Sequence, residues 1–164
     1  MIESTPSKIQ NYLPLIVIIV VSIIAGFVMT AITGLTWRMW MANFMGLFFF
    51  QLATFKFFDL EGFADGFAMY DIPTQYYRPY AYIYPFIEFG LALLFLGHLV
   101  PVITYIITII VMLVSFAGVI TALVKRREVA CACLGTVIKI PLTSLSLIEN
   151  IGMAFLSFVM LFWR

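Results

Sequence analysis

Charged residues are scarce in this sequence of 164 residues. Lys and Arg number nine and Asp and Glu eight, so charged residues make up 10% of the chain, against about 25% in soluble domains. Hydrophobic residues reach 64% and the mean hydropathy is +1.11, which indicates an integral membrane protein surrounded by the lipid bilayer. The net charge of +1 offers no basic surface for phosphates, and this argues against a nucleic-acid partner.

Cysteine and histidine are also few. The chain has two Cys and one His. These are too few for a haem bundle with several axial histidines, a disulfide framework, or a four-ligand zinc site built from Cys and His. Any chemistry must therefore come from a small number of residues, and their positions along the chain become informative.

Five apolar stretches are long enough to cross a membrane as helices, for which about 18 or more apolar residues are needed. They run from about residue 13 to 34, 39 to 58, 79 to 97, 101 to 124 and 142 to 163. Pro14, Pro79 and Pro101 lie near three of the starts, where proline is tolerated because a first-turn residue has no helical N–H bond to lose. The sequence predicts an all-α, polytopic helical bundle with its termini on opposite sides of the membrane.

The distribution of Lys and Arg predicts the orientation of these spans, because the basic excess normally faces the cytoplasm. With the N-terminus inside, Arg38 and Arg164 fall outside. The other basic residues fall inside: Lys8, Lys56, Arg78, Lys125, Arg126, Arg127 and Lys139. We therefore expect a multi-pass protein of the inner (plasma) membrane whose N-terminus and 125–141 connection are cytoplasmic.

The longest polar connection runs from residue 59 to 78. It contains four acidic residues, and Phe63, Phe67 and Tyr70 recur in it at helical spacing. This pattern predicts a short amphipathic helix in the membrane interface. The tyrosines between residues 70 and 84 are typical of an interfacial belt, and the alternative is a quinone or lipid slot lined by the same rings.

Two carboxylates, Glu88 and Glu149, lie inside predicted spans, and Lys56 lies near the cytoplasmic end of another. A charged side chain at such depth costs roughly 2.5–3.5 kcal/mol on insertion scales, so it should be paired, protonated or facing a cavity. A rise of about 1.5 Å per residue puts Glu88 roughly 13 Å and Glu149 roughly 10 Å deep, within reach of the long Lys56 side chain. Two interpretations stay open: structural hydrogen bonding between helices, or a site that handles protons or a ligand.

The remaining polar residues of the spans are less informative. Asn43, Gln51 and Asn150 lie within predicted helices, and His98 lies at the outer end of the third. The pKa of an unperturbed His, near 6.5, would allow a switch, but the sequence offers His98 no partner. We interpret it as an interfacial residue.

Cys131 and Cys133 are separated by one residue and follow three consecutive cations. Neighbouring Lys and Arg lower a thiol pKa and raise the thiolate fraction. A disulfide in so small a ring would be strained and easily reduced, which suits a catalytic couple. Two thiolates at this spacing are also good ligands for a soft ion such as Cu(I), and inert packing is the third interpretation.

The order of these features resembles the MauE/DoxX family of redox-associated membrane proteins, and most of all its MauE branch. The resemblance begins in residues 50–94, which read FQLATFKFFDLEGFADGFAMYDIPTQYYRPYAYIYPFIEFGLALL. In that family a Lys closes one span, a loop with a Phe-Ala-type helix and a Tyr…Pro segment follows, and a Glu lies in the next span. The matching residues here are Lys56, Phe63, Ala64, Tyr70, Pro73, Pro85 and Glu88. Residues 131–135, Cys-Ala-Cys-Leu-Gly, are similar to the Cys-x-Cys-x-Gly element of the MauE branch.

The resemblance implies a four-helix DoxX-like core in residues 39–164, with residues 1–38 adding one N-terminal transmembrane helix. It also implies a membrane component of a redox system linked to thiol–disulfide or quinone chemistry, similar to proteins that support methylamine dehydrogenase maturation. In this interpretation Cys131 and Cys133 exchange electrons with a redox partner protein and a quinone, Glu88 or Glu149 handles protons, and Lys56 is a further candidate catalytic residue. Such chemistry is expected to serve the periplasm, whereas the charge distribution puts the two thiols in the cytoplasm.

Two other functions are compatible with the residues. The first is transport or handling of a soft metal, copper or mercury, with the two thiolates as the entry site and Met39, Met41 and Met45 inside. The second is a non-catalytic membrane scaffold for redox enzymes. The sequence does not decide whether the protein is itself an enzyme.

Overall fold

Helices make up nearly all of the structure, a computed structural model that describes residues 8–34, 36–125, 130–131, 140–141 and 144–162. In this part of the chain the helices are α1 (Lys8–Thr33), α2 (Trp37–Phe58), α3 (Leu60–Ala68), α4 (Ile72–Tyr76), α5 (Pro79–Leu96), α6 (Pro101–Val124) and α7 (Ser144–Phe162). Two-residue strands, β1 (Ala130–Cys131) and β2 (Ile140–Pro141), pair antiparallel. The predicted all-α class is confirmed.

Four of these helices are long and apolar enough to cross a membrane: α1 over Leu13–Ile32, and α2, α5 and α6 over their full lengths. The fifth predicted span corresponds to α7, which has 19 residues and whose apolar part, Glu149–Phe162, is shorter. Residues 142, 143 and 163 of that predicted span lie outside the described part of the chain. The protein is therefore a polytopic membrane helical bundle.

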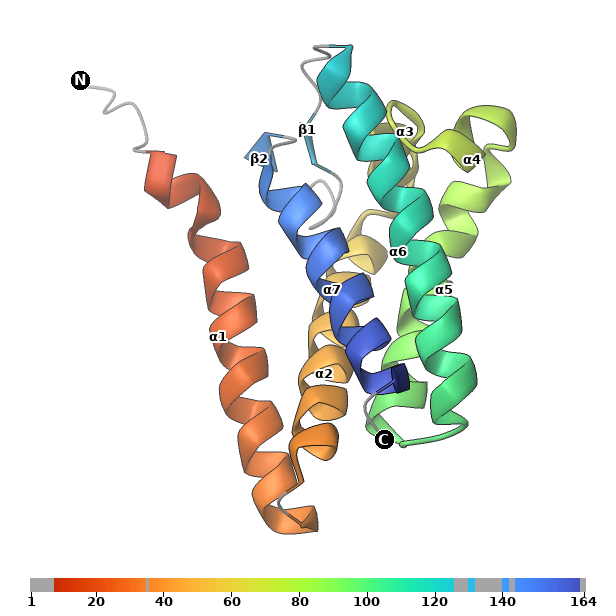
Figure 1. Ribbon diagram of the computed structural model, residues 1–164. Helices are drawn as coiled ribbons and strands as arrows, with labels where there is room; N and C mark the ends of the chain where they lie inside the picture. Colours follow the sequence, from red (N-terminus) through yellow and green to blue (C-terminus); the bar gives the residue numbers. More distant parts are fainter. Residues whose placement is uncertain (1–7, 35, 126–129, 132–139, 142–143, 163–164) are drawn as a thin grey trace, which may run out of the picture.

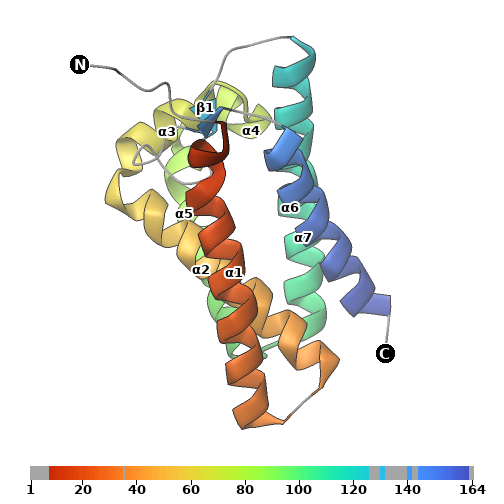
Figure 2. The same ribbon diagram turned by 90° about the vertical axis from the view of Figure 1, so that its left-hand side faces the viewer.

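The long helices run up and down the bundle in sequence order (Figures 1 and 2). Helix α1 packs along α2, α2 along α5, and α6 along α7. The start of α1 and the end of α7 lie at opposite ends of the bundle (Figure 1). Helices α3 and α4 and the β1–β2 pair share one end, which we call the hairpin end (Figure 1). The opposite end carries the α1–α2 and α5–α6 turns and is called the turn end.

Helix α1 begins earlier than the position of proline predicts. It starts at Lys8, so Pro14 lies inside the helix instead of in its first turn. A proline there removes one backbone hydrogen bond. The apolar run that follows is long enough for the helix to continue beyond the proline.

Small and polar residues hold α1 against α2. Gln51 Nε2 donates to Ser22 Oγ at 2.7 Å, and Asn43 Nδ2 donates to Thr30 Oγ1 at 3.0 Å. A Cβ atom added at Gly26 would lie 3.1 Å from the backbone nitrogen of Phe44, so glycine permits the close approach of the two helices. Such contacts are the usual means of helix association in lipid, where apolar side chains alone give little preference.

Helices α3 and α4 close the hairpin end of the bundle. Asp59 caps α3 by accepting from Gly62 N at 2.9 Å, as acidic N-cap residues commonly do. The amphipathic helix predicted between residues 59 and 78 is confirmed in α3, whose Phe63 and Phe67 are buried. These two rings form a second apolar cluster with Tyr70, Tyr84 and neighbouring residues of α5 and α6.

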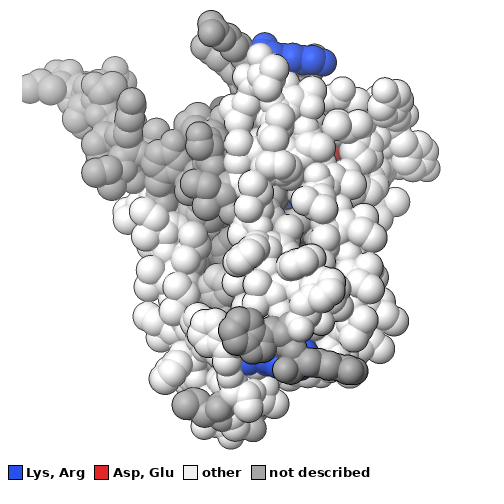
Figure 3. Space-filling view, in the orientation of Figure 1, with Lys and Arg blue, Asp and Glu red and all other residues white. Residues whose placement is uncertain are grey.

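The outer surface between the two ends is apolar. Many large hydrophobic side chains of α1, α5, α6 and α7 are exposed. On the face shown in Figure 3 the basic residues gather at the two ends, and the surface between them is almost free of charge. An uncharged band of this kind suits the hydrocarbon core of a bilayer.

Candidate functional site

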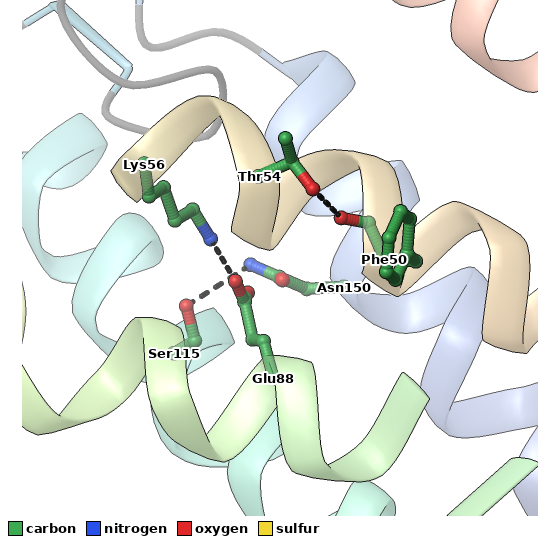
Figure 4. A network of polar contacts seen from close by, with 6 residues as sticks. All are labelled: Phe50, Thr54, Lys56, Glu88, Ser115 and Asn150. Atoms are coloured by element: carbon green, nitrogen blue, oxygen red, sulfur yellow. Dashed lines mark hydrogen bonds and ion pairs between the residues drawn. The ribbon is translucent and has the colours of Figure 1, made fainter. Parts of the chain in front are cut away.

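A buried ion pair forms the centre of the candidate site. Lys56, in the last turn of α2, pairs with Glu88 in the middle of α5. Only 3% of Lys56 and 2% of Glu88 is exposed. Figure 4 shows the two side chains pointing toward each other from neighbouring helices. Lys56 therefore lies inside the bundle, as its long stem allows, and partly compensates the cost of burying the Glu88 carboxylate.

Aromatic rings enclose the ammonium group. Lys56 Nζ lies 5.3 Å from the ring centroid of Phe63 and 5.0 Å from that of Tyr84. Both distances fall within the range of cation–π attraction, which strengthens when the cation is desolvated. Because Phe63 lies on α3, the amphipathic helix covers the ion pair from the hairpin end of the bundle.

A second polar contact lies beside the pair and joins the other two helices. Asn150 Nδ2 on α7 donates to Ser115 Oγ on α6 at 3.5 Å. Figure 4 shows this contact next to Glu88. The site thus receives polar side chains from α2, α5, α6 and α7.

These groups line a small internal cavity of about 20 Å³. Its polar lining comes from Lys56, Tyr84, Glu88, Ser115, Glu149 and Asn150, and its apolar lining from α3 and α6. A volume of this size holds about one water molecule. The three side chains whose meeting was predicted from their depths, Lys56, Glu88 and Glu149, therefore converge on one cavity.

Glu149 differs from Glu88 in having a free oxygen. Its Oε2 atom is buried and has no hydrogen-bond partner among the described residues. Glu149 also lines a groove of about 180 Å³ between α1, α2 and α7. The other lining residues of that groove are apolar: Leu15, Ile19, Phe44, Phe48, Gly152, Met153 and Leu156. Glu149 therefore stands between the polar cavity and an apolar groove.

Comparison with protein families identifies the chain. The family described as methylamine utilisation protein MauE matches residues 16–163, nearly the whole sequence. The chain belongs to the MauE family. MauE is in turn a DoxX-like membrane family, so the resemblance drawn from Lys56, Glu88 and the Cys-x-Cys element is confirmed. No curated protein and no solved structure matches the chain.

The MauE match begins inside α1 and so includes most of that helix. In the structure α1 is joined to α2 by two interhelical hydrogen bonds. The division into residues 1–38 and a four-helix unit of residues 39–164 stays a prediction. Membership of MauE makes this a membrane protein related to methylamine utilisation.

Of the Cys-x-Cys element of this MauE protein, the structure describes only the backbone of Cys131. Cys131 lies in β1 opposite Ile140 of β2, and β1 contacts α3. Cys133 lies outside the described residues. The predicted roles of the two thiols stay predictions.

Sequence reasoning missed two residues of the cavity, Tyr84 and Ser115. Tyr84 precedes Glu88 by four residues, and this spacing puts both on one face of α5. That signal was available in the sequence. Ser115 lies on α6, 27 residues beyond Glu88 in the chain, and only the packing of α6 against α7 and α5 brings it close.

The other candidate residues lie elsewhere. Asn43 and Gln51 serve the α1–α2 contact, and His98 lies exposed at the turn end. Met41 and Met45 are buried in a larger apolar cluster that also contains Phe49 and Phe95. Within the described residues, no group of three or more His, Cys, Asp or Glu could hold a metal ion.

Proposed function

We propose that this MauE protein is the membrane component of a thiol–disulfide redox system that supports maturation of a dehydrogenase of the methylamine-utilising type. The observation that carries the proposal is the position of β1. This strand, which contains Cys131, contacts α3, and α3 covers the buried Lys56–Glu88 pair through Phe63. Strand β1 and the buried ion pair thus both border α3.

The electron balance follows from thiol–disulfide exchange. A thiolate of the partner protein attacks the Cys131–Cys133 disulfide and forms a mixed disulfide. The second partner thiol resolves it, so the partner gains a disulfide and Cys131 and Cys133 become thiols. Returning them to the disulfide releases two electrons and two protons. A quinone is a two-electron, two-proton acceptor, and it would supply the oxidising power when bound.

We place such an acceptor in the apolar groove between α1, α2 and α7. Its walls are apolar, and the unpartnered Oε2 of Glu149 provides a hydrogen-bonding group. Glu149 would accept a proton there and hold it next to the cavity that contains Lys56 and Glu88. The Lys56–Glu88 pair lines the same cavity as Glu149, and its charges would help to hold the Glu149 carboxyl group in position.

Trapping the mixed disulfide tests the proposal. Cys131→Ser and Cys133→Ser variants are each expressed in membranes and separated under non-reducing conditions. One of them should accumulate a reducible adduct with a partner protein. The remaining thiolate attacks the partner's disulfide, which is the reverse of the exchange above, and the second Cys that would resolve the mixed disulfide is missing. An Ala132→Ser variant, which changes the residue between the two thiols, serves as the matched control and should give no adduct.

The contrary result is equally clear. If neither variant forms an adduct and both thiols resist alkylation in native membranes, thiol exchange is not the function. Retained biological activity of the double Cys→Ser variant would then point to a scaffold. Cys-dependent binding of Cu(I) to the purified protein would point to metal handling.

A further inference from the structure

A pocket at the turn end lies away from the candidate site. Its volume is about 390 Å³, within the usual range of ligand sites. It is formed by the start of α2, the end of α5 and the start of α6. Its lining includes Thr36, Arg38, Met39, Leu94, His98 and Tyr105.

Positive charge dominates this pocket. Arg38 is in no ion pair with any described residue, and its one hydrogen bond to them, to the backbone oxygen of Met160, is long at 3.4 Å. The described carboxylates lie on α5, α7 and the 59–71 segment. Among these carboxylates, the one nearest in sequence to the pocket residue His98 is that of Glu88. It lies ten residues earlier, which is about 15 Å along a helix. No carboxylate of the described residues therefore pairs with the guanidinium of Arg38.

Two long helices add partial positive charge to the pocket, because α2 and α6 both begin there. The N-terminus of a helix carries partial positive charge and unpaired N–H groups. Val100, which precedes α6, makes no side-chain cap. The first turn of α6 thus has donors without a side-chain acceptor.

The side chain of Tyr105 supplies an independent observation. Tyr105 lines the pocket and is only 5% exposed as a residue. Its hydroxyl makes no hydrogen bond to any described residue and is not among the buried unpartnered atoms, so it is available to donate to a ligand in the pocket. The backbone beside it is also held in an unfavourable conformation, since His98 and Val100 both have positive φ, 50° and 37°.

We propose that this pocket binds the head group of an anionic membrane lipid. Arg38 and the N-terminus of α6 hold the phosphate, and the Tyr105 hydroxyl donates a hydrogen bond to it. Met39, Leu94 and Phe95 form an apolar wall for the adjoining part of the lipid. A lipid is favoured over a soluble anion because the pocket combines one cationic side with this apolar wall at the membrane surface.

Tryptophan fluorescence can test the proposal on the full chain in detergent. The three tryptophans are Trp37, Trp40 and Trp163, and the first two lie in the first turns of α2, beside the pocket. Brominated phosphatidylglycerol should quench them in a saturable way. Brominated phosphatidylcholine with the same chains should quench only weakly, because its head group has no net charge.

Variants connect the signal to the pocket. Arg38→Gln should weaken phosphatidylglycerol binding about tenfold or more, as expected for loss of a charge-assisted contact, and Arg38→Lys should restore part of it. Tyr105→Phe should weaken it by a smaller factor. Lys125→Gln is the matched control, since Lys125 is an exposed cation at the far end of α6, and it should leave binding unchanged.

Two results would overturn the proposal. The first is equal quenching by the two brominated lipids. Equal quenching by phosphatidylglycerol in wild type, Arg38→Gln and Tyr105→Phe, when both variants elute as folded protein, would have the same meaning. The second is displacement of phosphatidylglycerol by inorganic phosphate at equal concentration, which would assign the pocket to a soluble anion.

Discussion

Among single residues, Lys56 and Glu88 are those whose separate replacement is expected to cost most stability, because they form a buried ion pair. Both are almost fully buried and neither is paired with any other charged residue in the described part of the chain. A buried pair contributes little relative to well-packed apolar residues, but removing one partner leaves an uncompensated charge. The consequence can be tested by replacing the partners singly and together.

Lys56→Met and Glu88→Gln are each expected to lower the free energy of unfolding by about 3–5 kcal/mol. The double variant should lose less than the sum of the two, because neither charge is then left alone. Unfolding by denaturing detergent, followed by circular dichroism, measures both effects. Lys125→Gln, at an exposed cation, should change stability by less than about 0.5 kcal/mol. Additive losses in the double variant would show that the pair is not coupled.

Glu149 has a different role at this scale. Its Oε2 atom has no hydrogen-bond partner among the described residues and it borders both the cavity and the apolar groove, whereas Glu88 is paired with Lys56. Depth in the span, read from the sequence, does not distinguish the two carboxylates. Their partners do, and these follow from helix packing.

At the scale of elements, the α3–α4 junction determines how the hairpin end closes. Asp71 caps α4, accepting from Thr74 N at 3.0 Å and Thr74 Oγ1 at 2.7 Å. A Cβ atom at Gly118 of α6 would lie 2.8 Å from the Tyr70 carbonyl oxygen, so glycine lets α6 pass close to this junction. Burial raises the pKa of Asp71 above its usual value, and the hydrogen bonds from Thr74 offset part of the rise.

The raised pKa of Asp71 gives a signed pH dependence. Between the unfolded and the folded pKa the folded protein binds more protons, so Asp71 reduces stability progressively as the pH rises above about 3.8. Asp71→Asn keeps a capping oxygen and removes the buried charge. Its melting temperature in detergent should match that of wild type at acid pH and equal or exceed it at neutral pH.

Asp71→Ala provides the contrast, because it removes the cap itself. It should lower stability by about 1 kcal/mol at acid pH, and by less at neutral pH, where the wild-type protein has lost part of the stability that protonated Asp71 allows. A neutral-pH melting temperature of Asp71→Asn as low as that of Asp71→Ala would mean that the ionised carboxylate is needed at this position.

For the whole molecule, the main question is which side of the membrane the hairpin end faces, because that side determines which compartment the two thiols can serve. The excess of Lys and Arg predicts that this end is cytoplasmic, whereas MauE-linked thiol chemistry is expected in the periplasm. A membrane-impermeant thiol reagent separates the two. If the charge distribution is correct, Cys131 and Cys133 are labelled in inverted vesicles and not in intact cells.

If the two thiols are labelled in intact cells and not in inverted vesicles, the hairpin end faces the periplasm and the predicted orientation is wrong. The control is a Val100→Cys variant of a chain that lacks Cys131 and Cys133. Val100 lies in the α5–α6 turn, at the other end of the bundle. This variant should label from the side opposite to the hairpin end.

The sequence alone predicts much of this protein. Long apolar runs determine the helices, since a backbone in lipid must satisfy its hydrogen bonds within the helix. The order of Lys56, the Phe63 helix, Glu88 and the Cys-x-Cys element predicts the family, and depth arguments predict that Lys56, Glu88 and Glu149 can meet. These features depend on local composition and on distance along a helix axis.

Only the tertiary structure shows which faces of the helices meet. It pairs Lys56 with Glu88 and gives one oxygen of Glu149 no partner among the described residues. It also adds Tyr84 and Ser115 to the cavity and assembles the pocket that Arg38 lines from three helix ends. Apolar runs of nearly uniform hydrophobicity do not mark the face that packs inward. That choice is made by a few small and polar residues, such as Gly26, Ser22 and Gly118, whose effect appears only when two helices come into contact.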